Sequence, residues 1–283
     1  ITQASTTTSI TNISPNPATV GDLYTVTASV SGFGIPSGNI IVSDGLGMSC
    51  QITLPATSCD LRSVNTGPRT ISASYSGDTN NLPSATNTNF TVIAAASTTS
   101  IDMINPSPSI VGSPYDVLAS VSGFGVPTGT IMVDDGTGAN CTITLPATSC
   151  ALSSSTAGAK SISAVYSGDA NNLASNTSSP HQVDRFASTT QIIAVNPEPS
   201  AAGELYSVEV QVTGFGVLKG QVTVDDGLGQ SCVINLPSTA CSISTFTAGA
   251  VTLSAQYTGD TNNLPSADTS MHTVTQAVTN LSI

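Results

Sequence analysis

The stretch Tyr75-Ser76-Gly77-Asp78 occurs three times in the chain, returning as Tyr166-Ser167-Gly168-Asp169 and as Tyr257-Thr258-Gly259-Asp260. Successive copies begin 91 residues apart, with no insertion or deletion between them. A period of about 90 residues suits one β-sandwich and is too long for a solenoid repeat. The chain of 283 residues is therefore predicted to contain three tandem copies of one domain.

The period also sets the expected domain boundaries. We expect repeat 1 at residues 1–94, repeat 2 at residues 95–185 and repeat 3 at residues 186–276. Residues 277–283 then begin a further repeat or form a terminal joining strand. The terminal strand, Val274 to Ile283, aligns with the entrance to a new copy, so it either belongs to a longer array or pairs with another subunit in self-assembly.

Hydrophobic residues alternate with polar residues inside each repeat. Tyr24, Val26 and Ala28 point one way and the polar residues between them point the other, which is the period of a half-buried strand. Ile71 and Tyr75 share a face in another such strand. Turn signals rich in Gly, Pro and Asp separate the strands, and the linkers are short and not rich in Gly and Ser. These patterns predict an all-β fold of three tandem immunoglobulin-like Greek-key β-sandwiches in an extended rod.

Each repeat holds one pair of cysteines: Cys50 with Cys59, Cys141 with Cys150, and Cys232 with Cys241. The segment between them is predicted to be a strand, a Leu-Pro turn and a strand, and we expect a hairpin that brings the two cysteines within disulfide reach. Zinc needs four ligands and no repeat has a third cysteine, so a disulfide is favoured over a metal site or a redox pair. Each disulfide should stabilise its domain by roughly 2.5–3 kcal/mol and implies an oxidising compartment.

Residues 38–45, 50–59 and 75–84 resemble bacterial immunoglobulin-like repeat domains, and the Tyr-Ser-Gly-Asp stretch is the most specific part of the likeness. The resemblance covers essentially the whole chain. It implies a spacer or adhesin module of a large secreted or cell-surface protein of Gram-negative bacteria, with no catalytic residues to carry over. The neighbouring repeats of the same chain are the first partners that it implies.

The chain is acidic, because 17 Asp and Glu against five Lys and Arg give a net charge of −12. Its basic residues form no cluster, and binding to a phosphate backbone needs such a cluster to release counterions. We therefore expect no nucleic acid as a partner. No apolar run is long enough for a transmembrane helix, so no membrane insertion is expected in this segment.

The two histidines are the usual first candidates for catalysis, and both fall on a packing position. His181 and His272 correspond to Phe90 of repeat 1. A position that accepts phenylalanine belongs to a core, and no Ser-His-Asp set recurs in all copies. We therefore predict that the protein is not an enzyme and uses no cofactor.

Acidic turns are the second class of candidate site. Calcium needs about six to eight oxygen ligands, and the loop of about twelve residues that ends in Glu is missing. Asp and Gly are also ordinary turn residues, because Asp caps its own backbone and Gly supplies a positive φ. Plain turns are the prediction, and calcium is the alternative. The candidate ligands are Asp44, Asp134, Asp135, Asp225, Asp226, Asp78, Asp169 and Asp260.

Phe33, Phe124 and Phe215 each lie between two glycines in a loop. Such a ring either folds back to cap the end of its sandwich or stays exposed as a ligand contact. The leading functional hypothesis is a non-enzymatic structural module, the stalk or fibre of a bacterial extracellular, cell-surface, adhesin-type or filament-forming protein. The alternative is an adhesive binding module that contacts a glycan or a host protein through these phenylalanines or the acidic turns.

Overall fold

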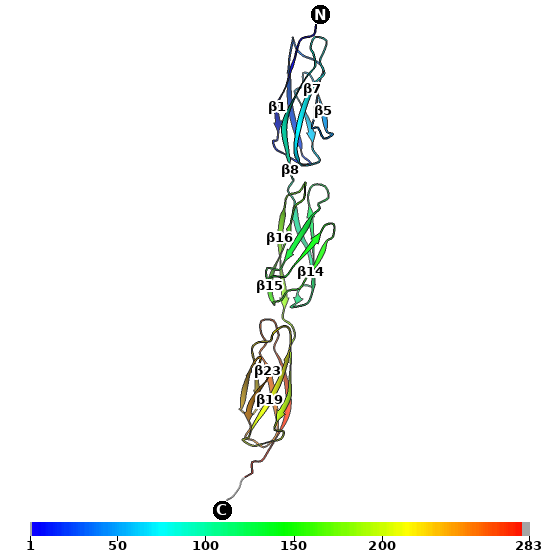
Figure 1. The fold of residues 1–283 in the computed structure, drawn as a ribbon. Coiled ribbons are helices and arrows are strands. Elements are labelled where there is room, and N and C mark those ends of the chain that lie inside the picture. Colours follow the sequence, from blue (N-terminus) through cyan, green and yellow to red (C-terminus); the bar gives the residue numbers. More distant parts are fainter. Residues whose placement is uncertain (1, 279–283) are drawn as a thin grey trace, which may run out of the picture.

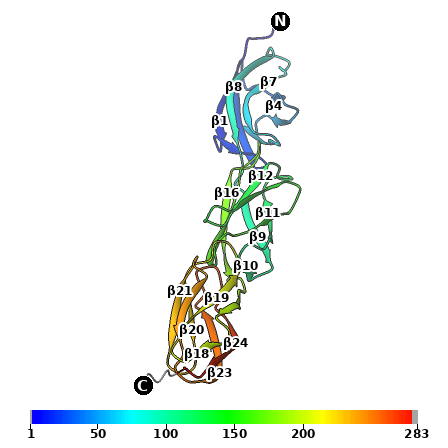
Figure 2. The same cartoon turned by 60° about the horizontal axis from the view of Figure 1, so that its bottom comes forward.

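The computed structural model describes residues 2–278 and contains three β-sandwiches in a row. Figures 1 and 2 show an extended rod in which the chain enters at one tip and leaves toward the other. The all-β class and the three tandem domains predicted from the sequence are thus confirmed. Residues 2–278 hold no helix with the length and apolar character needed to cross a membrane.

Each repeat contains eight strands at equivalent positions. Those of repeat 1 are β1 (Thr7–Ser14), β2 (Ala18–Thr19), β3 (Leu23–Ser31), β4 (Asn39–Ser43), β5 (Ser49–Thr53), β6 (Ser58–Arg62), β7 (Gly67–Tyr75) and β8 (Ser84–Ile93). Those of repeat 2 are β9 (Thr98–Asn105), β10 (Ser109–Ile110), β11 (Tyr115–Ser122), β12 (Thr130–Asp134), β13 (Asn140–Thr144), β14 (Ser149–Leu152), β15 (Gly158–Tyr166) and β16 (Ser175–Asp184). Those of repeat 3 are β17 (Thr189–Asn196), β18 (Ser200–Ala201), β19 (Leu205–Thr213), β20 (Gln221–Asp225), β21 (Ser231–Asn235), β22 (Ala240–Ser244), β23 (Gly249–Tyr257) and β24 (Ser266–Thr275).

The strands of each repeat form two sheets that face each other. In repeat 1 one sheet has the order β1-β3-β6 and the other the order β2-β8-β7-β4-β5, and repeats 2 and 3 follow the same orders. Neighbouring strands are antiparallel except that β2 runs parallel to β8. The parallel pairs of the other repeats are β10 with β16 and β18 with β24.

The core of each sandwich comes from the alternating residues that the sequence predicts. Tyr24, Val26 and Ala28 of β3 are buried and face Ile71 and Tyr75 of β7 across the sandwich. Full burial of an apolar side chain contributes about 1.5–3 kcal/mol, so each of these positions matters in a domain with few aromatic residues. The equivalent strands of repeats 2 and 3 supply the same kind of core.

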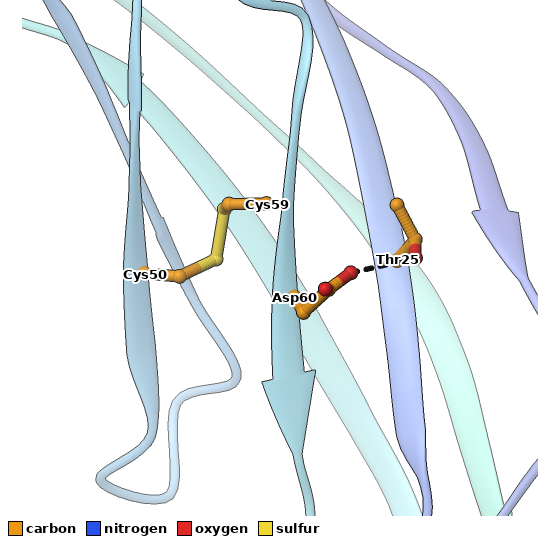
Figure 3. The surroundings of a disulfide bond; sticks show 4 residues. All are labelled: Thr25, Cys50, Cys59 and Asp60. Atoms are coloured by element: carbon orange, nitrogen blue, oxygen red, sulfur yellow. Dashed lines mark hydrogen bonds between the residues drawn. A yellow bond between two sulfur atoms is a disulfide. The ribbon is translucent and has the colours of Figure 1, made fainter.

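The three disulfides connect the predicted cysteine pairs, with 6.0 Å between the Cα atoms in each. The expected hairpin is wrong, however, because β5 and β6 belong to different sheets. Pro55 has no N–H to continue a strand ladder, and the turn at residues 53–56 carries the chain from one sheet to the other. Figure 3 shows the bond between Cys50 and Cys59, with Asp60 reaching Thr25 of β3 on the other side. The disulfide therefore joins the two sheets at an edge of the sandwich.

The terminal strand predicted for subunit joining begins inside repeat 3. Val274 is buried in the core of that repeat, and Thr275 pairs with Ala201 of β18. These two residues are thus already used within the domain. Residues 279–283 lie outside the described residues.

Candidate functional site at the joints between repeats

Repeats 1 and 2 meet at joint 1, which lies around Ala94. On one side of this residue the carbonyl of Ile93 accepts a hydrogen bond of 2.9 Å from the N–H of Val20 in repeat 1. On the other side the N–H of Ala95 donates a hydrogen bond of 2.9 Å to the carbonyl of Asn171 in repeat 2. Only Ala94, with two soft backbone dihedrals, separates the segments that are fixed to the two domains.

Joint 2, between repeats 2 and 3, has the same construction around Arg185. The carbonyl of Asp184 accepts a hydrogen bond of 2.9 Å from the N–H of Val111 in repeat 2. The N–H of Phe186 donates a hydrogen bond of 2.8 Å to the carbonyl of Asn262 in repeat 3. Each linker is therefore a continuation of both neighbouring domains, and we take the two joints as the candidate functional site.

The recurring Tyr-Ser-Gly-Asp stretch holds a loop at the N-terminal end of each repeat. In repeat 1 the Tyr75 hydroxyl lies 2.7 Å from the carbonyl of Ser37 and 3.0 Å from Oδ2 of Asp78. Oδ1 of Asp78 accepts hydrogen bonds from the backbone and the side chain of Asn81. The Asn81 side chain in turn accepts from the N–H of Phe33 at 2.8 Å and donates to its carbonyl at 3.2 Å. The motif thus fixes the loop that carries the phenylalanine.

These hydrogen bonds favour the ionised form of the aspartates. The backbone N–H of Ser37 is the main cause that lowers the pKa of Asp78. Partial burial raises the pKa of Asp260, but hydrogen bonds from Asn263 and from the backbone of Lys219 outweigh it and hold the pKa at about 2. Because this pKa lies below the unfolded value, the resulting stability is present above pH ~4 and is lost as the pH falls through about 2.

The phenylalanine of this loop packs against the preceding repeat. Phe124 of repeat 2 contacts the core of repeat 1 and lies over Gly21, where an added Cβ would overlap the ring. Phe215 of repeat 3 lies over Gly112 of repeat 2 in the same way. Phe33 has no preceding repeat among the described residues and is 70% exposed. The sequence predicts a ring that caps its own sandwich or stays free, and in the joints it caps the neighbouring one.

Hydrogen bonds between domains accompany the aromatic contact. At joint 1 the hydroxyl of Thr66 donates to the carbonyl of Ala170 at 2.6 Å, and its N–H lies 3.3 Å from Oδ1 of Asn171. At joint 2 the N–H of Ala157 donates to Oδ1 of Asn262 at 2.9 Å. These residues were not predicted from the sequence, although the asparagines and the glycine under the ring recur with the 91-residue period and could have indicated them.

Joint 2 also has an open cavity on one side. Its volume is about 660 Å³, and its walls include Ile110, Arg185 and Leu264. Phe186 of the linker lies 6.3 Å from Phe215, measured between ring centroids, so joint 2 holds two aromatic rings. Joint 1 has Ala95 at the position of Phe186 and therefore holds one.

The acidic turns use their carboxylates within their own repeat, in the turn itself and against a neighbouring strand. Oδ1 of buried Asp44 accepts hydrogen bonds from the N–H groups of Leu46 and Met48, and Oδ2 lies 2.9 Å from the Arg69 guanidinium. The equivalent turn carboxylates are Asp135 and Asp226. Asp134 and Asp225 each accept a hydrogen bond from a turn glycine. Within residues 2–278 no group of three or more His, Cys, Asp or Glu is arranged to hold a metal ion. Calcium stays an untested alternative.

The histidines lie at the packing position that the sequence predicts. His181 is buried, stacks on Tyr115 with ring centroids 4.5 Å apart, and lies 2.8 Å from the Ser109 hydroxyl. In repeat 1 Phe90 stacks on Tyr24 with ring centroids 4.7 Å apart. Repeats 1 and 2 therefore share a ring at this position that packs on a tyrosine. Burial lowers the pKa of His181. In repeat 3 His272 has the same place and also contacts Glu198.

One sequence family matches the chain. The model of the bacterial Ig-like domain (group 3) matches residues 10–93 and 103–184, which together make up more than half of the chain. The two segments begin within β1 and β9 and end with β8 and β16, so they cover most of repeats 1 and 2. No curated protein matches the chain.

Solved structures of similar fold include a tetra-tandem repeat in the extending region of a large adhesion protein. It is 18% identical, with 95% of this chain and 74% of that chain covered and a TM-score of 0.47. The fibronectin(III)-like modules of CbhA from Clostridium thermocellum are 16% identical, with 63% and 94% covered and a TM-score of 0.29. The N-terminal eight Ig domains of Down Syndrome Cell Adhesion Molecule are 13% identical, with 98% and 36% covered and a TM-score of 0.35.

Proposed function

The chain belongs to the family of bacterial Ig-like domains (group 3), and from this premise we propose that it is a non-enzymatic, load-bearing stalk segment of an extracellular or cell-surface bacterial protein of adhesin type. The observation that carries the proposal is the way in which the first and last segments of each repeat are bonded. They lie side by side and run in the same direction, so that tension along the rod pulls them past each other.

The first attachment is at the N-terminal end of the repeat. Ala4 pairs in parallel with the segment just before β8, donating to the carbonyl of Asn80 and accepting from the N–H of Leu82 at 2.8 Å each. Further along, the hydroxyls of Thr8 and Ser84 are 2.7 Å apart, which connects β1 to the start of β8.

The second attachment is at the C-terminal end. Ala18 and Thr19 of β2 pair in parallel with Val92 and Ile93, the last residues of β8. Force applied at the two ends of the repeat therefore shears both attachments, and the hydrogen bonds are loaded together instead of opening one after another. We therefore expect a high unfolding barrier along this coordinate, as a role in carrying tension requires.

Two further features support an extracellular rod. The disulfides join the sheets of every repeat, and such bonds persist in oxidising compartments. The net charge of −12 keeps neighbouring rods apart at low ionic strength. The alternative, a binding module that contacts a glycan or a host protein, draws its support from Phe33, since Phe124 and Phe215 are used in the joints.

Single-molecule force spectroscopy of the full chain tests the proposal. We expect three unfolding events, each releasing about 280 Å of contour length, because about eight of the roughly 90 residues of a repeat stay locked between its disulfide-bonded cysteines. Reduction of the disulfides should add about 27 Å to each event, because the eight residues between the cysteines are then released. This increment identifies the events as intact repeats.

Proline substitutions at two neighbouring positions distinguish the loss of an attachment hydrogen bond from the mere presence of proline in the linker. Ala95→Pro removes the N–H that donates to Asn171, and one of the three events should move to a clearly lower force. Ala94→Pro, one residue earlier, removes no such bond and serves as the control. If all three wild-type repeats unfold at the force of the Ala95→Pro repeat, the load-bearing role is contradicted.

A further inference from the structure

The cavity at joint 2 is lined by both of the domains that meet there. Repeat 2 contributes Ile110, Gln182 and Asp184, the linker contributes Arg185, and repeat 3 contributes Leu264. Its volume of about 660 Å³ is typical of cavities that hold small ligands. The wall combines apolar side chains with a cation, a carboxylate and an amide. It therefore suits a ligand that is apolar on one face and polar at its edge.

Joint 1 lacks the charged side chains of this wall. Ala94 has the place of Arg185, and Ile93 has the place of Asp184. The hydrogen bonds that fix the linker are nevertheless equivalent at both joints, and they use only backbone groups on each side of this residue. Because Ala94 is sufficient to connect two repeats, the joint does not need the side chain of Arg185. Its charge is therefore available for a role other than connecting the domains.

The Arg185 guanidinium has no ionic partner within the protein. The residue is exposed. Within residues 2–278 side chains form ion pairs at Arg69 with Asp44 and at His272 with Glu198, and none at Arg185. A guanidinium donates two parallel hydrogen bonds to a carboxylate or a phosphate group. An anionic group is therefore the part of a ligand that this residue recognises.

The groups beside Arg185 limit the class of this ligand. Asp184 shares the cavity wall, so the local charges cancel, and the second charge of a phosphate monoester would be repelled where a single carboxylate is not. Gln182 and Thr261 can donate and accept hydrogen bonds, and the carboxylate of Asp184 accepts them, as the hydroxyl groups of a sugar require. The apolar side chains of the wall can cover the C–H face of a sugar ring.

We propose that the cavity at joint 2 binds a sugar unit that carries one carboxylate, that is, a uronic acid or a similar acidic unit of a polysaccharide. Arg185 pairs with the carboxylate, Gln182 and Asp184 bond to hydroxyl groups, and Thr261 contacts the ligand from repeat 3. The cavity is open on one side and makes few contacts, so the dissociation constant should be about 1 mM. The proposal goes beyond the stalk role and does not depend on it, because binding does not require the repeats to carry tension.

A ligand in this cavity contacts two domains at once. Gln182 belongs to repeat 2 and Thr261 to repeat 3, so the bound sugar bridges the joint. A ligand that binds one arrangement of two domains stabilises that arrangement by mass action. The acidic sugar therefore favours the observed arrangement of repeats 2 and 3.

Two-dimensional NMR of the full chain at pH 7 tests the proposal, with methyl glucuronoside and methyl galacturonoside as probes. We expect the backbone amide signals of Gly158, Ala187 and Thr261 to shift in a saturable way with at least one of these sugars. The equivalent amides of joint 1, those of Gly67 and Ala96, should not shift. The methyl esters of the same sugars lack the charge and should bind about tenfold more weakly.

Two variants and a simple anion provide the controls. Arg185→Ala, which gives joint 2 the linker residue of joint 1, should fold unchanged and weaken binding about tenfold. Arg62→Ala removes the same charge from an exposed position of repeat 1 and should leave binding unchanged. Acetate supplies a carboxylate without a sugar and should bind much more weakly.

Three results would overturn the site. These are the absence of shifts with both sugars at about ten times the expected dissociation constant, equal weakening by the two arginine variants, and equal binding of the sugars and their esters. Equal binding of acetate and the sugars would overturn the assignment of the ligand to a sugar. Each of these results leaves the force measurements on the repeats unaffected, so a failure here is distinguishable from a failure of the stalk role.

Discussion

Phe33 and Phe124 occupy the same position in consecutive repeats, between the same two glycines and under the same asparagine clamp. Nevertheless Phe33 is exposed, whereas Phe124 is half-buried against the core of repeat 1. The difference comes from the neighbouring domain and not from the loop. The joint is therefore assembled from surfaces that each repeat forms independently. The same substitution at two equivalent positions, one inside a joint and one outside, then separates the effect of the loop from the effect of the contact between domains.

The largest effect is expected at the glycine under the ring. Gly112→Val should cost about 1–2 kcal/mol for a side chain in the left-handed region, and about 1–3 kcal/mol more because the new atoms overlap Phe215. Gly203→Val has the same backbone strain without an incoming ring. Calorimetry of the two full-length variants measures the difference, and equal losses would show that no contact exists at joint 2.

Removal of the ring itself should have the next largest effect. Phe124→Ala is expected to lower the stability of the joined repeats by about 1–2 kcal/mol, because the apolar area that this half-buried ring buries against repeat 1 is lost. Phe33→Ala should change stability by less than about 0.5 kcal/mol, as is usual for an exposed residue. Thermal unfolding of both variants gives the comparison. A similar loss in the two would mean that the ring acts within its own repeat.

Acid should distinguish the cores of repeats 1 and 2. Because burial lowers the pKa of His181 below its unfolded value, repeat 2 is fully stabilised above pH ~6.5 and loses stability as the pH falls below it, by at most about 1.4 kcal/mol per pH unit. Repeat 1 has Phe90 at this position and should not respond. Amide hydrogen exchange in β16 and β8 between pH 7 and 5 tests this, with His181→Phe as the control. Equal responses of the two strands would contradict the burial of an uncharged histidine.

The smallest effect is expected for the interdomain hydrogen bond. Asn171→Ala removes the side-chain oxygen near Thr66 and should cost about 0.5–1.5 kcal/mol. Asn80→Ala, at the exposed equivalent, should be neutral. The midpoints of chemical unfolding report both changes, and a cost at Asn80 would place the role of the asparagine inside the loop.

The sequence was sufficient for the strands and the core, because period-2 alternation at Tyr24, Val26 and Ala28 is a local signal. The position of His181 was also predictable, since Phe90 of repeat 1 reveals what the site accepts. The sequence did not reveal to which sheet the second cysteine of each pair belongs, because a Leu-Pro turn between two short strands is equally typical of a hairpin. The destination of Phe124 depends on Gly21, about one hundred residues earlier, and no local pattern encodes such a contact.

The central claim is that each joint is stiff because a single free linker residue, the phenylalanine of the following repeat and one asparagine fix the two domains to each other. Double electron–electron resonance between nitroxides on Ser29→Cys and Ser120→Cys, equivalent exposed positions of repeats 1 and 2, tests it most directly. We predict a narrow distance distribution that broadens in the Phe124→Ala background. A broad distribution in the otherwise unmodified chain would contradict the account, because it would mean that Ala94 acts as a free hinge.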